Sequence, residues 1–409
     1  MTNIVLLLGI PVFGILCLFL TTFVVLGITA SVTGRPNRDS DQPPVSVIIP
    51  AYNEETLIQQ CITSFRRATY PEDRTEIIVV DDGSTDKTRN LVDECEATLI
   101  QQDHAGKVAA LNNAYQHATN NIIIVADADT TVNPSFLNAI TTPFSNEAIG
   151  AVSGAVTPLH QKTALKWFQT VEYYYNNYIR RAVSTVFSTD IWFFGCIAAY
   201  RRQALEDIDG FPADSLTEDM DIVMRMRQEG WRAVHAANAT GKTKTPDTVS
   251  ELSRQRRRWW GGGYQLLSQH KSLFGDDATF TFITLHHWWW AVYATLSIPL
   301  LAYQFAHWLP TGILEISFYT FRWFTLLGPV AVIYNIPAGW LSWYNVFGVV
   351  SGLLTTGLIL AALYTYEKGF TATDAVALFL YFPYTILLNT FILLGVWEAT
   401  KNPRNTYIR

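Results

Sequence analysis

Residues 122–129 read Ile-Ile-Ile-Val-Ala-Asp-Ala-Asp, five apolar residues followed by two aspartates one residue apart. A short apolar run rich in β-branched residues and closed by polar residues is typical of a buried strand. Two similar runs lie upstream. Residues 45–50 end at a proline, and residues 77–80 lead into Asp-Asp-Gly-Ser. The three runs predict the centre of an open sheet.

Helical spacing separates these predicted strands. Apolar residues recur on one side of residues 54–67, and a second helix is predicted over 107–118, after a weaker strand at 98–101 and a glycine at position 106. Strands that alternate with helices predict an α/β fold with a mostly parallel sheet. Ligands of such sheets bind at the carboxyl ends of the strands, so the polar clusters there should converge on one site.

The composition divides the chain into polar and apolar parts. Of its 409 residues, 49% are hydrophobic and only 16% are charged, and the apolar residues gather in 4–33 and about 280–398. The net charge of -6 argues against a nucleic-acid binder, which would need a basic excess. The cysteines show no short-spaced pair for zinc, so we expect reduced thiols of a cytosolic domain at Cys61, Cys95 and Cys196, with Cys17 in an apolar run.

Residues 4–33 carry no charge and are long enough to cross a bilayer as a helix. A cleavable signal peptide is the alternative, but the start lacks Lys or Arg and the run exceeds a signal core. We therefore expect an uncleaved anchor. Arg35 and Arg38 follow it directly, which favours a cytoplasmic position for the next domain.

Four further membrane segments are predicted after Gly275. The first contains His286, His287 and three tryptophans, a composition that also suits a helix in the membrane plane. The second carries Glu315 and Arg322, which are costly inside a bilayer. Four crossings, favoured over three, would return the basic tail (401–409) to the cytoplasm. The predicted segments are 283–306, 313–334, 343–364 and 374–397.

The aspartates that follow the strands have two interpretations. Asp81 and Asp82 before Gly-Ser could form a turn or cap a helix. Asp127 and Asp129 point the same way if the strand continues, because side chains alternate along a strand. They could then share a hard cation, Mg²⁺ or Mn²⁺, which binds oxygen ligands and bridges diphosphates. Their place at neighbouring strand ends favours the second interpretation.

Two more motifs follow. Thr217-Glu218-Asp219 begins a predicted helix, where it could act as a cap or supply a general base, and the sequence does not separate these. Gln255-Arg-Arg-Arg258-Trp259 precedes three glycines. A patch for anionic lipid headgroups would explain the charges alone. An Arg that pairs with a phosphoryl group and a Trp that stacks on a sugar explain more of the motif.

Taken in order, these motifs resemble the signature series of the processive family-2 glycosyltransferases, which include cellulose, chitin, hyaluronan and poly-N-acetylglucosamine synthases. The resemblance covers about residues 44–265 and the flanking membrane architecture. Five motifs in order are highly specific: Pro50-Ala51-Tyr52-Asn53-Glu54, Asp81-Asp82-Gly83-Ser84, Asp127-Ala128-Asp129, Thr217-Glu218-Asp219 and Gln255-x-x-Arg258-Trp259.

The resemblance implies a GT-A fold, flanked by transmembrane helices, and an inverting transfer from a UDP-sugar. Under it, Asp219 is the general base beside Glu218, and Asp129 ligates Mg²⁺ or Mn²⁺. Gln255, Arg258 and Trp259 position the pyrophosphate and the acceptor end. The residues implied for substrate binding are Pro50, Ala51, Tyr52, Glu54, Asp82, Lys107, Asp127 and Cys196.

Two further segments have open interpretations. Residues 193–196 (Phe-Phe-Gly-Cys) resemble the family's acceptor-lining loop, with Trp192 as an added stacking surface, but would also suit a buried strand. Residues 172–178, followed by Arg180 and Arg181, suit an amphipathic helix on the membrane surface or one packed on the catalytic domain. Residues 194–262 look most like the poly-N-acetylglucosamine synthase branch. The departure is a single N-terminal span where many relatives show two.

The sequence therefore predicts an anchor (1–34), a cytoplasmic transferase domain (35–275), a membrane region (276–400) and a tail (401–409) in the plasma membrane. The expected partners are a UDP-sugar, foremost UDP-N-acetylglucosamine, membrane lipids, and either a growing β-linked polysaccharide or a lipid acceptor, without nucleic acid. Accessory subunits and export of the polymer stay open. A transporter or scaffold with a degenerate transferase domain is a third alternative, against which the five undamaged motifs argue.

Overall fold

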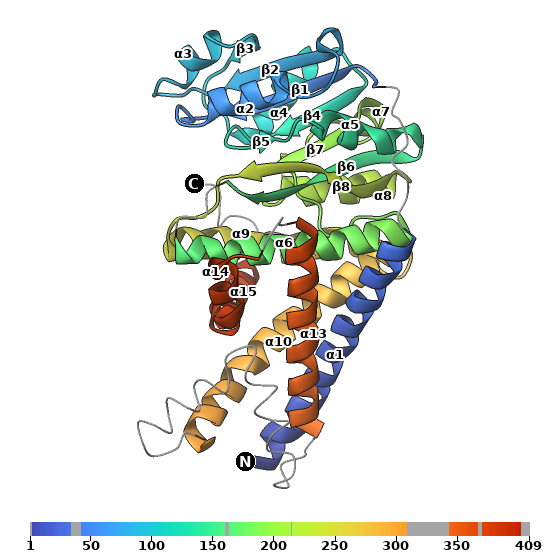
Figure 1. Ribbon diagram of the computed structural model, residues 1–409. Helices are drawn as coiled ribbons and strands as arrows, with labels where there is room; N and C mark the ends of the chain where they lie inside the picture. The colour runs from blue at the N-terminus through green and yellow to red at the C-terminus, as the bar shows by residue number, and fades with distance from the viewer. Residues whose placement is uncertain are drawn as a thin grey trace.

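The computed structural model describes residues 2–33, 42–159, 163–213, 215–308, 343–366 and 370–401. They form three layers (Figure 1). An α/β domain with one large sheet lies at one end, and two long helices, α6 (Ala164–Phe187) and α9 (Val249–Gln269), run beneath it. Longer apolar helices extend away from α6 and α9 on the side opposite the sheet.

The sheet has eight strands in the order β3-β2-β1-β4-β7-β6-β8-β5. Strands β3, β2, β1 and β4 are parallel, whereas β7 runs antiparallel to both β4 and β6. The predicted strands at 45–50, 77–80, 98–101 and 122–126 are confirmed, as is the mostly parallel α/β class. The strands are β1 (Val45–Ala51), β2 (Thr75–Asp81), β3 (Thr98–Gln101), β4 (Ile122–Ala126), β5 (Thr131–Val132), β6 (Ile149–Pro158), β7 (Ile197–Arg201) and β8 (Arg232–Thr243).

Side chains alternate along each buried strand, so both faces of the sheet carry apolar residues. Helices cover both faces. Val47 and Ile49 of β1 pack on the side of Phe65 in α2 (Ile58–Arg66), whereas Ile48 packs on the side of Leu111 in α4 (Lys107–His117). The shorter helices of this domain are α3 (Thr88–Asp93), α5 (Phe136–Thr141), α7 (Arg202–Glu206) and α8 (Glu218–Gln228). The register pairs Ala51 with Asp81, so the polar segments after β1 and β2 begin at the same edge.

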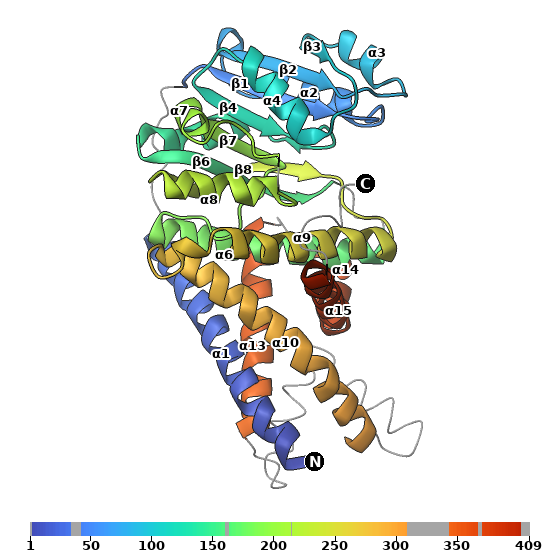
Figure 2. The same cartoon turned by 180° about the vertical axis from the view of Figure 1, so that it is seen from behind.

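Helix α6 joins the sheet to the long apolar helices (Figure 2). It contacts β6 and β8 on one side and α1, α13 and α14 on the other, so it packs on the catalytic domain, and its position at a membrane surface stays a prediction. Its residue Arg180 is fully buried rather than lying on a membrane surface. The physical reason is a buried carboxylate partner on the catalytic domain, described below.

Three described helices are long and apolar enough to cross a membrane: Gly9–Val32 of α1, Val346–Tyr366 of α13 and Tyr381–Lys401, which is α15. The predicted spans 4–33 and 343–364 correspond to α1 (Thr2–Val32) and α13 (Trp343–Tyr366). The predicted span 283–306 falls in α10 (Ala278–Trp308), which runs beside α1 and is not among the three. The predicted span 313–334 lies outside the described residues.

The predicted span 374–397 overlaps the candidate span Tyr381–Lys401 but starts too early. A capping box of Thr371 and Asp374 starts a short helix, α14 (Ala372–Phe379), and α15 begins after Leu380. Pro383 lies in the first turn of α15, where a proline is tolerated, but its ring and missing N–H oppose a helix that continues through it. The chain therefore changes direction before the last apolar helix.

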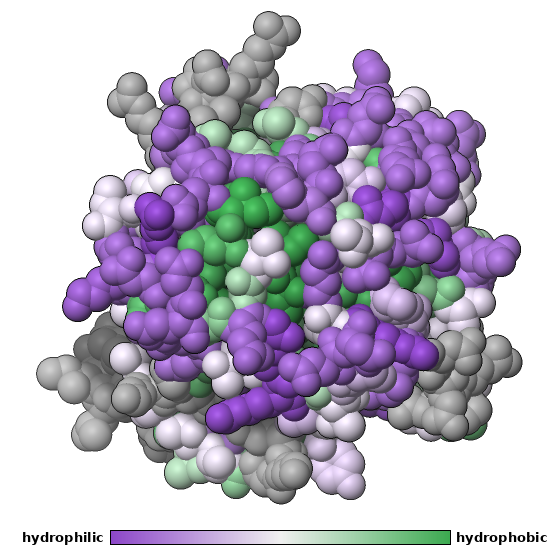
Figure 3. All heavy atoms as spheres, turned by 90° about the horizontal axis from the view of Figure 1, so that it is seen from above, coloured by the Kyte–Doolittle hydropathy of each residue, from purple (hydrophilic) through white to green (hydrophobic). Residues whose placement is uncertain are grey.

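The end of the molecule farthest from the apolar helices has a different surface. Figure 3 looks down on this end and shows mostly hydrophilic residues around a central apolar area. The exposed large hydrophobic residues, by contrast, gather on α1, α10, α13 and α15. This division is consistent with water around the sheet and lipid around the helices.

Candidate active site

Asp82 follows the end of β2 and accepts hydrogen bonds from the segment that follows β3. One carboxylate oxygen accepts from Nε2 of Gln102 at 2.7 Å and from the N–H of Ala105 at 2.9 Å. The other accepts from the N–H of Gly106 at 2.8 Å and lies 2.9 Å from Nδ1 of His104. Burial opposes ionisation, but these hydrogen bonds outweigh it and hold the pKa of Asp82 below its ordinary value.

Two stacked rings lie beside this carboxylate. The rings of Tyr52 and His104 have centroids 4.2 Å apart and planes 26° apart, and Tyr52 is 44% exposed. Pro50 and Ala51 end β1 below them, and the Ala51 carbonyl accepts a hydrogen bond from the N–H of Asp82 at 2.9 Å. A flat aromatic surface beside a fixed carboxylate, at the carboxyl edge of a parallel sheet, suits a nucleobase and its ribose.

Lys107, the first residue of α4, connects two of the predicted motifs. Its Nζ lies 2.9 Å from Oδ1 of Asp127 and 2.9 Å from Oε1 of Glu218. Burial disfavours the charged amine, but the two carboxylates outweigh it and raise the pKa of Lys107 well above its ordinary value. The structure thus brings the end of β4 to the start of α8, where the charged amine of Lys107 could also approach a diphosphate.

Acidic side chains crowd next to Lys107. Oδ1 of Asp129 accepts hydrogen bonds from the hydroxyls of Thr130 and Thr243, each at 3.1 Å. Burial and the neighbouring Asp127 raise the pKa of Asp129. Burial, followed by Asp129, raises the pKa of Glu54 to about 7. A divalent cation would relieve this crowding of carboxylates, so the residues fit Mg²⁺ or Mn²⁺.

Within the part of the chain that the structure describes, no group of three or more His, Cys, Asp or Glu residues could hold a metal ion by itself. Mg²⁺ commonly binds through one or two carboxylates together with substrate phosphates. The donor set around Asp129 therefore suits a cation that arrives with, and is shared by, a nucleoside diphosphate.

Asp219 in α8 is held in place by backbone amides. Its Oδ2 accepts from the N–H of Gly195 and its Oδ1 from the N–H of Met220, both at 2.9 Å. Burial and then the charge of Glu218 raise the pKa of Asp219 to about 6. The hydroxyl of Thr217, at the N-cap, makes no capping hydrogen bond. A half-buried carboxylate that backbone amides hold in place, with a raised pKa, suits a general base, so the geometry favours that interpretation over a simple cap.

Glycines allow three close approaches around this carboxylate. A Cβ on Gly195 would lie 2.5 Å from Cβ of Asp219, one on Gly262 2.6 Å from a methyl of Thr217, and one on Gly263 2.6 Å from Nε2 of His287. No side chain fits at such distances, so any other residue would push these elements apart. Gly262 therefore allows close packing of α9 against the start of α8, and Gly263 allows close packing against α10.

The motif Gln255–Trp259 lies on α9, on the membrane side of the site. The ring of Trp259 stacks near-parallel on Phe194, with centroids 6.3 Å apart. Arg258 is exposed and close enough to Glu218 to stabilise its ionised form. Gln255 accepts a hydrogen bond from Arg256 at 2.7 Å. The structure therefore brings Trp259 beside the loop that holds Asp219.

The segment at 193–196 is a loop before β7 rather than a strand. The carbonyl of Cys196 accepts a hydrogen bond from the N–H of Asp127 at 3.0 Å. Burial, followed by the charge of Asp127, raises the pKa of the Cys196 thiol. This residue therefore contributes its backbone, which links the acceptor-side loop to the end of β4, and its thiol stays protonated.

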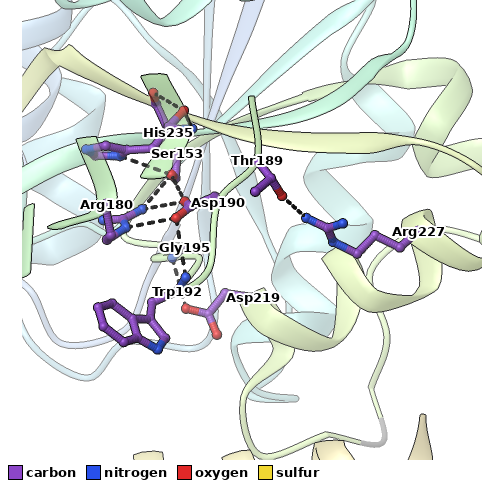
Figure 4. A network of polar contacts seen from close by, with 10 residues as sticks. Ser153, Arg180, Thr189, Asp190, Trp192, Gly195, Asp219, Arg227 and His235 are labelled. Carbon is purple, nitrogen blue, oxygen red and sulfur yellow. Dashed lines mark hydrogen bonds and ion pairs between the residues drawn. The ribbon is translucent and has the colours of Figure 1, made fainter. Parts of the chain in front are cut away.

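A buried polar cluster behind this loop was missed by the sequence analysis (Figure 4). Arg180 donates to both carboxylate oxygens of Asp190, at 3.1 and 2.7 Å, and all of these atoms are inaccessible to solvent. Ser153 donates to Asp190 at 2.5 Å and lies 3.4 Å from Nδ1 of His235. Asp190 also accepts from the N–H of Trp192 at 3.3 Å, which fixes the start of the loop. No local motif contains these residues, so no sequence pattern pointed to them.

Comparison with known proteins agrees with this geometry. Residues 43–262, more than half of the chain, match the family described as "Glycosyltransferase like family 2". The chain belongs to this family. The prediction of a family-2 glycosyltransferase is thereby confirmed at the level of the family, which argues against a transporter or scaffold.

The sequence relatives of this glycosyltransferase differ in their acceptors. It is 30% identical over 225 residues to a probable glycosyltransferase, YdaM, of Bacillus subtilis (52% of this chain, 54% of the relative). It is 29% identical over 246 residues to the beta-monoglucosyldiacylglycerol synthase of Nostoc sp. (53% and 49%), and 26% identical over 219 residues to the poly-beta-1,6-N-acetyl-D-glucosamine synthase of Staphylococcus epidermidis (52% and 52%). The chain spans about half the length of the curated relatives it matches.

A solved structure shares the fold of this glycosyltransferase. The mannosyltransferase PcManGT of Pyrobaculum calidifontis, in complex with GDP-Man and Mn²⁺, superposes with a TM-score of 0.55 at 21% identity, over 87% of this chain and 100% of that one. This similarity confirms the GT-A-like mixed sheet. GT-A enzymes typically use a divalent metal, and that relative contains one.

Proposed function

We propose that this glycosyltransferase moves a sugar, foremost N-acetylglucosamine, from its UDP donor to the end of a growing β-linked polysaccharide. The observation that carries the proposal is the meeting of two motifs at Lys107, which contacts Asp127 of one and Glu218, next to Asp219, of the other. Donor-side and acceptor-side groups thereby converge on one point, with Trp259 of α9 at the membrane side.

The nucleotide side would bind and orient the donor. The rings of Tyr52 and His104 suit stacking on the nucleobase. The ionised Asp82 suits a hydroxyl of the ribose or an N–H of the nucleobase. Lys107 and the exposed Arg258 would stabilise the negative charge that builds on the departing UDP. Asp127 and Asp129 would hold a divalent cation, which supplies further charge neutralisation at the diphosphate when it is bound.

The acceptor side would remove a proton. In the reaction, an acceptor oxygen bonds to the anomeric carbon as the bond from that carbon to the diphosphate breaks, and the acceptor proton moves to Asp219. Attack from the side opposite the leaving group inverts the anomeric centre, so an α-linked donor gives a β-linkage. Asp219 is suited to this step because burial and Glu218 raise its pKa while two amides fix its oxygens.

A radiolabel assay tests the proposal. The full chain in lipid vesicles is given labelled UDP-N-acetylglucosamine, UDP-glucose, UDP-glucuronate or, as a control for the nucleotide, GDP-mannose. We expect UDP-N-acetylglucosamine to give a ladder of long products. Incorporation from GDP-mannose alone would contradict the UDP specificity, and a single labelled lipid species would contradict chain elongation.

Transfer of one sugar to a lipid is the second candidate. It is supported by the similarity to the beta-monoglucosyldiacylglycerol synthase of Nostoc sp., which is closer in identity than the polysaccharide synthase. The Gln255–Trp259 motif favours elongation, because the ring of Trp259, beside the loop that holds Asp219, suits the terminal sugar of a polysaccharide. Addition of diacylglycerol to the vesicles separates the two: only the lipid candidate predicts a labelled glycolipid that depends on it.

The membrane arrangement belongs to the same proposal. With the anchor formed by α1 and the transferase domain on the cytoplasmic face of the plasma membrane, UDP-sugars in the cytosol would have direct access to the edge of β1 and β2. The three candidate spans support membrane association. Cleavage by a protease added to one side of oriented vesicles tests the orientation.

A further inference from the structure

Two buried guanidinium groups contact an aromatic pair between the catalytic sheet and the membrane helices. The guanidinium carbon of Arg180 lies 4.3 Å from the ring centroid of Phe194, and that of Arg256 lies 4.2 Å from the ring centroid of Trp259. Phe194 and Trp259 are stacked on each other, with planes 25° apart. We call these four residues, in contact order Arg180, Phe194, Trp259 and Arg256, the Arg–aromatic chain.

Each cation at the end of the Arg–aromatic chain has its own buried anchor. Arg180 is paired with Asp190 of the catalytic domain. Arg256, which is 3% exposed, is paired with Glu172 of α6 at 2.9 Å. Tyr384 of α15 donates its hydroxyl to the same carboxylate oxygen of Glu172 at 2.6 Å. Buried charges are retained only when they are paired, so Glu172 holds Arg256 in place and α15 holds Glu172.

The Arg–aromatic chain passes beside the general base at Phe194. Phe194 precedes Gly195, whose N–H binds the carboxylate of Asp219. A shift of Arg256 would therefore act first on the ring of Trp259, whereas Asp219 is held separately by amides and by the Arg180–Asp190 side of the loop. The acceptor surface and the base thus share Phe194 but differ in their other anchors, Arg256 for the ring of Trp259 and backbone amides for Asp219.

Arg256 has a close counterpart that lacks the ring contact. The neighbouring Arg257 also joins α9 to α15, through an ion pair with Glu398. Among the described residues, Arg257 makes no cation–aromatic contact. Both arginines therefore help to attach α9 to α15, Arg257 directly and Arg256 through Glu172 and Tyr384. Only Arg256 of the two lies over the ring of Trp259.

We propose that Arg256 is a positioning residue: anchored by Glu172 and by Tyr384 of a membrane helix, it fixes the ring of Trp259 and so sets the acceptor end against Asp219. This inference rests on the proposed function, in which Trp259 contacts the acceptor. It adds a link from α15 to the acceptor site. A shift of α15 would move Tyr384, and through Glu172 and Arg256 it would change the position of the Trp259 ring.

Displacement of the acceptor leaves water as the competing nucleophile. The same bond between the anomeric carbon and the diphosphate then breaks, the water oxygen bonds to the anomeric carbon, and one water proton moves to Asp219. The products are the free sugar and UDP. A misplaced Trp259 should therefore raise the share of donor that is hydrolysed and raise the KM for the acceptor, while the KM for the donor stays unchanged.

The experiment uses the full chain in vesicles with labelled UDP-N-acetylglucosamine and a titrated N-acetylglucosamine oligosaccharide. Arg256→Gln should raise the acceptor KM on the order of tenfold, the size of a lost buried cation–aromatic contact. Arg256→Lys, which keeps the charge, should recover part of this loss. Tyr384→Phe should raise the acceptor KM about threefold, as expected for one hydrogen bond to a charged group. Arg257→Gln is the matched control and should leave both KM values within about twofold.

The outcomes separate the inference from the proposed function. An equal rise in acceptor KM for Arg256→Gln and Arg257→Gln, or a parallel rise in donor KM, would overturn the positioning role. If Arg256→Gln does not fold, Tyr384→Phe decides, because it keeps every charge; an unchanged acceptor KM and hydrolysed share in that variant overturns the inference. A wild-type chain that transfers no sugar to the oligosaccharide contradicts the proposed function itself, and with it any acceptor role of Arg256.

Discussion

The two sides of the site are built in different ways. On the nucleotide side, Asp82 is held mainly by backbone amides and an amide side chain from residues 102–106. On the membrane side, the loop that carries Gly195 is held through its own Asp190, which binds the side chains of Ser153 in β6 and Arg180 in α6. The first arrangement depends on the local path of the backbone, and the second on buried charges that must find each other.

This difference determines how each side should respond to substitution. If Asp82 is replaced, the backbone amides that it accepted lie at the edge of the sheet, where they can find other partners or water. A fully buried ion pair leaves an uncompensated charge when one partner is removed. The membrane side should therefore be the more sensitive to changes that leave every motif intact. Four predictions test this contrast, from the largest expected effect to the smallest.

Asp219→Asn should lower the rate of transfer by about 10²- to 10⁴-fold, because the neutral amide cannot accept the acceptor proton. UDP binding, measured by calorimetry, should persist because the nucleotide side is built separately. Asp207→Asn, at an exposed position, is the control. Full turnover in Asp219→Asn would show that another group is the base, and loss of UDP binding would show that the two sides are not independent.

Asp190→Ala should lower the free energy of unfolding by about 3–5 kcal/mol, because Arg180 would remain buried without its carboxylate. Glu72→Ala removes the exposed partner of Arg66 and should cost about 1 kcal/mol or less. Denaturant unfolding of both variants in detergent measures the difference. Equal costs would mean that burial does not distinguish the two pairs.

Gly195→Ala should reduce transfer on the order of 100-fold, because the new Cβ would displace Asp219 from its position. Gly357→Ala in α13, where a Cβ meets no atom within 4 Å, is the matched control. Steady-state kinetics with unchanged donor KM would locate the damage on the acceptor side. A wild-type rate in Gly195→Ala would contradict the close contact.

The pH dependence should differ between the two sides. Asp219 must be ionised to act as base, and its raised pKa means that this form is lost as the pH falls through about 6. Transfer should then decrease about tenfold for each further pH unit. Asp82 has a lowered pKa and stays ionised over the same range, so UDP binding should persist. Parallel loss of transfer and UDP binding near pH 6 would contradict the separation.

Much of the nucleotide side could be predicted from the sequence. The strand runs at 45–50, 77–80 and 122–126 have a local signal, and the parallel register brings their polar ends to one edge. The roles of Asp82, Asp127 and Asp129 remain predictions, but their convergence follows from strand order alone. Membrane helices α1 and α13 could be predicted for a similar reason, because length and apolarity are local properties.

The membrane side could not be predicted in the same way. Arg180 looked like a surface cation, because its partner Asp190 lies beyond the end of α6 and helical spacing does not show that the chain turns back to bring the two together. The contact of Arg256 with Glu172 and Tyr384 joins three helices, and a pattern of charges does not specify such pairs. The break at Leu380 was also missed, since an apolar stretch reads as one helix unless its cap and proline are given weight.

The three consecutive glycines of α9 carry a consequence for local stability. A glycine inside a helix is about 1 kcal/mol less favourable than alanine, so Gly261–Gly263 form an intrinsically weak point of a long helix. Packing against Thr217 and His287 compensates for that weakness. Amide hydrogens at this point should therefore exchange through opening events smaller than global unfolding. Such an opening would loosen the contact of α9 with the start of α8 and with α10, while α6 still joins the sheet to α1 and α13.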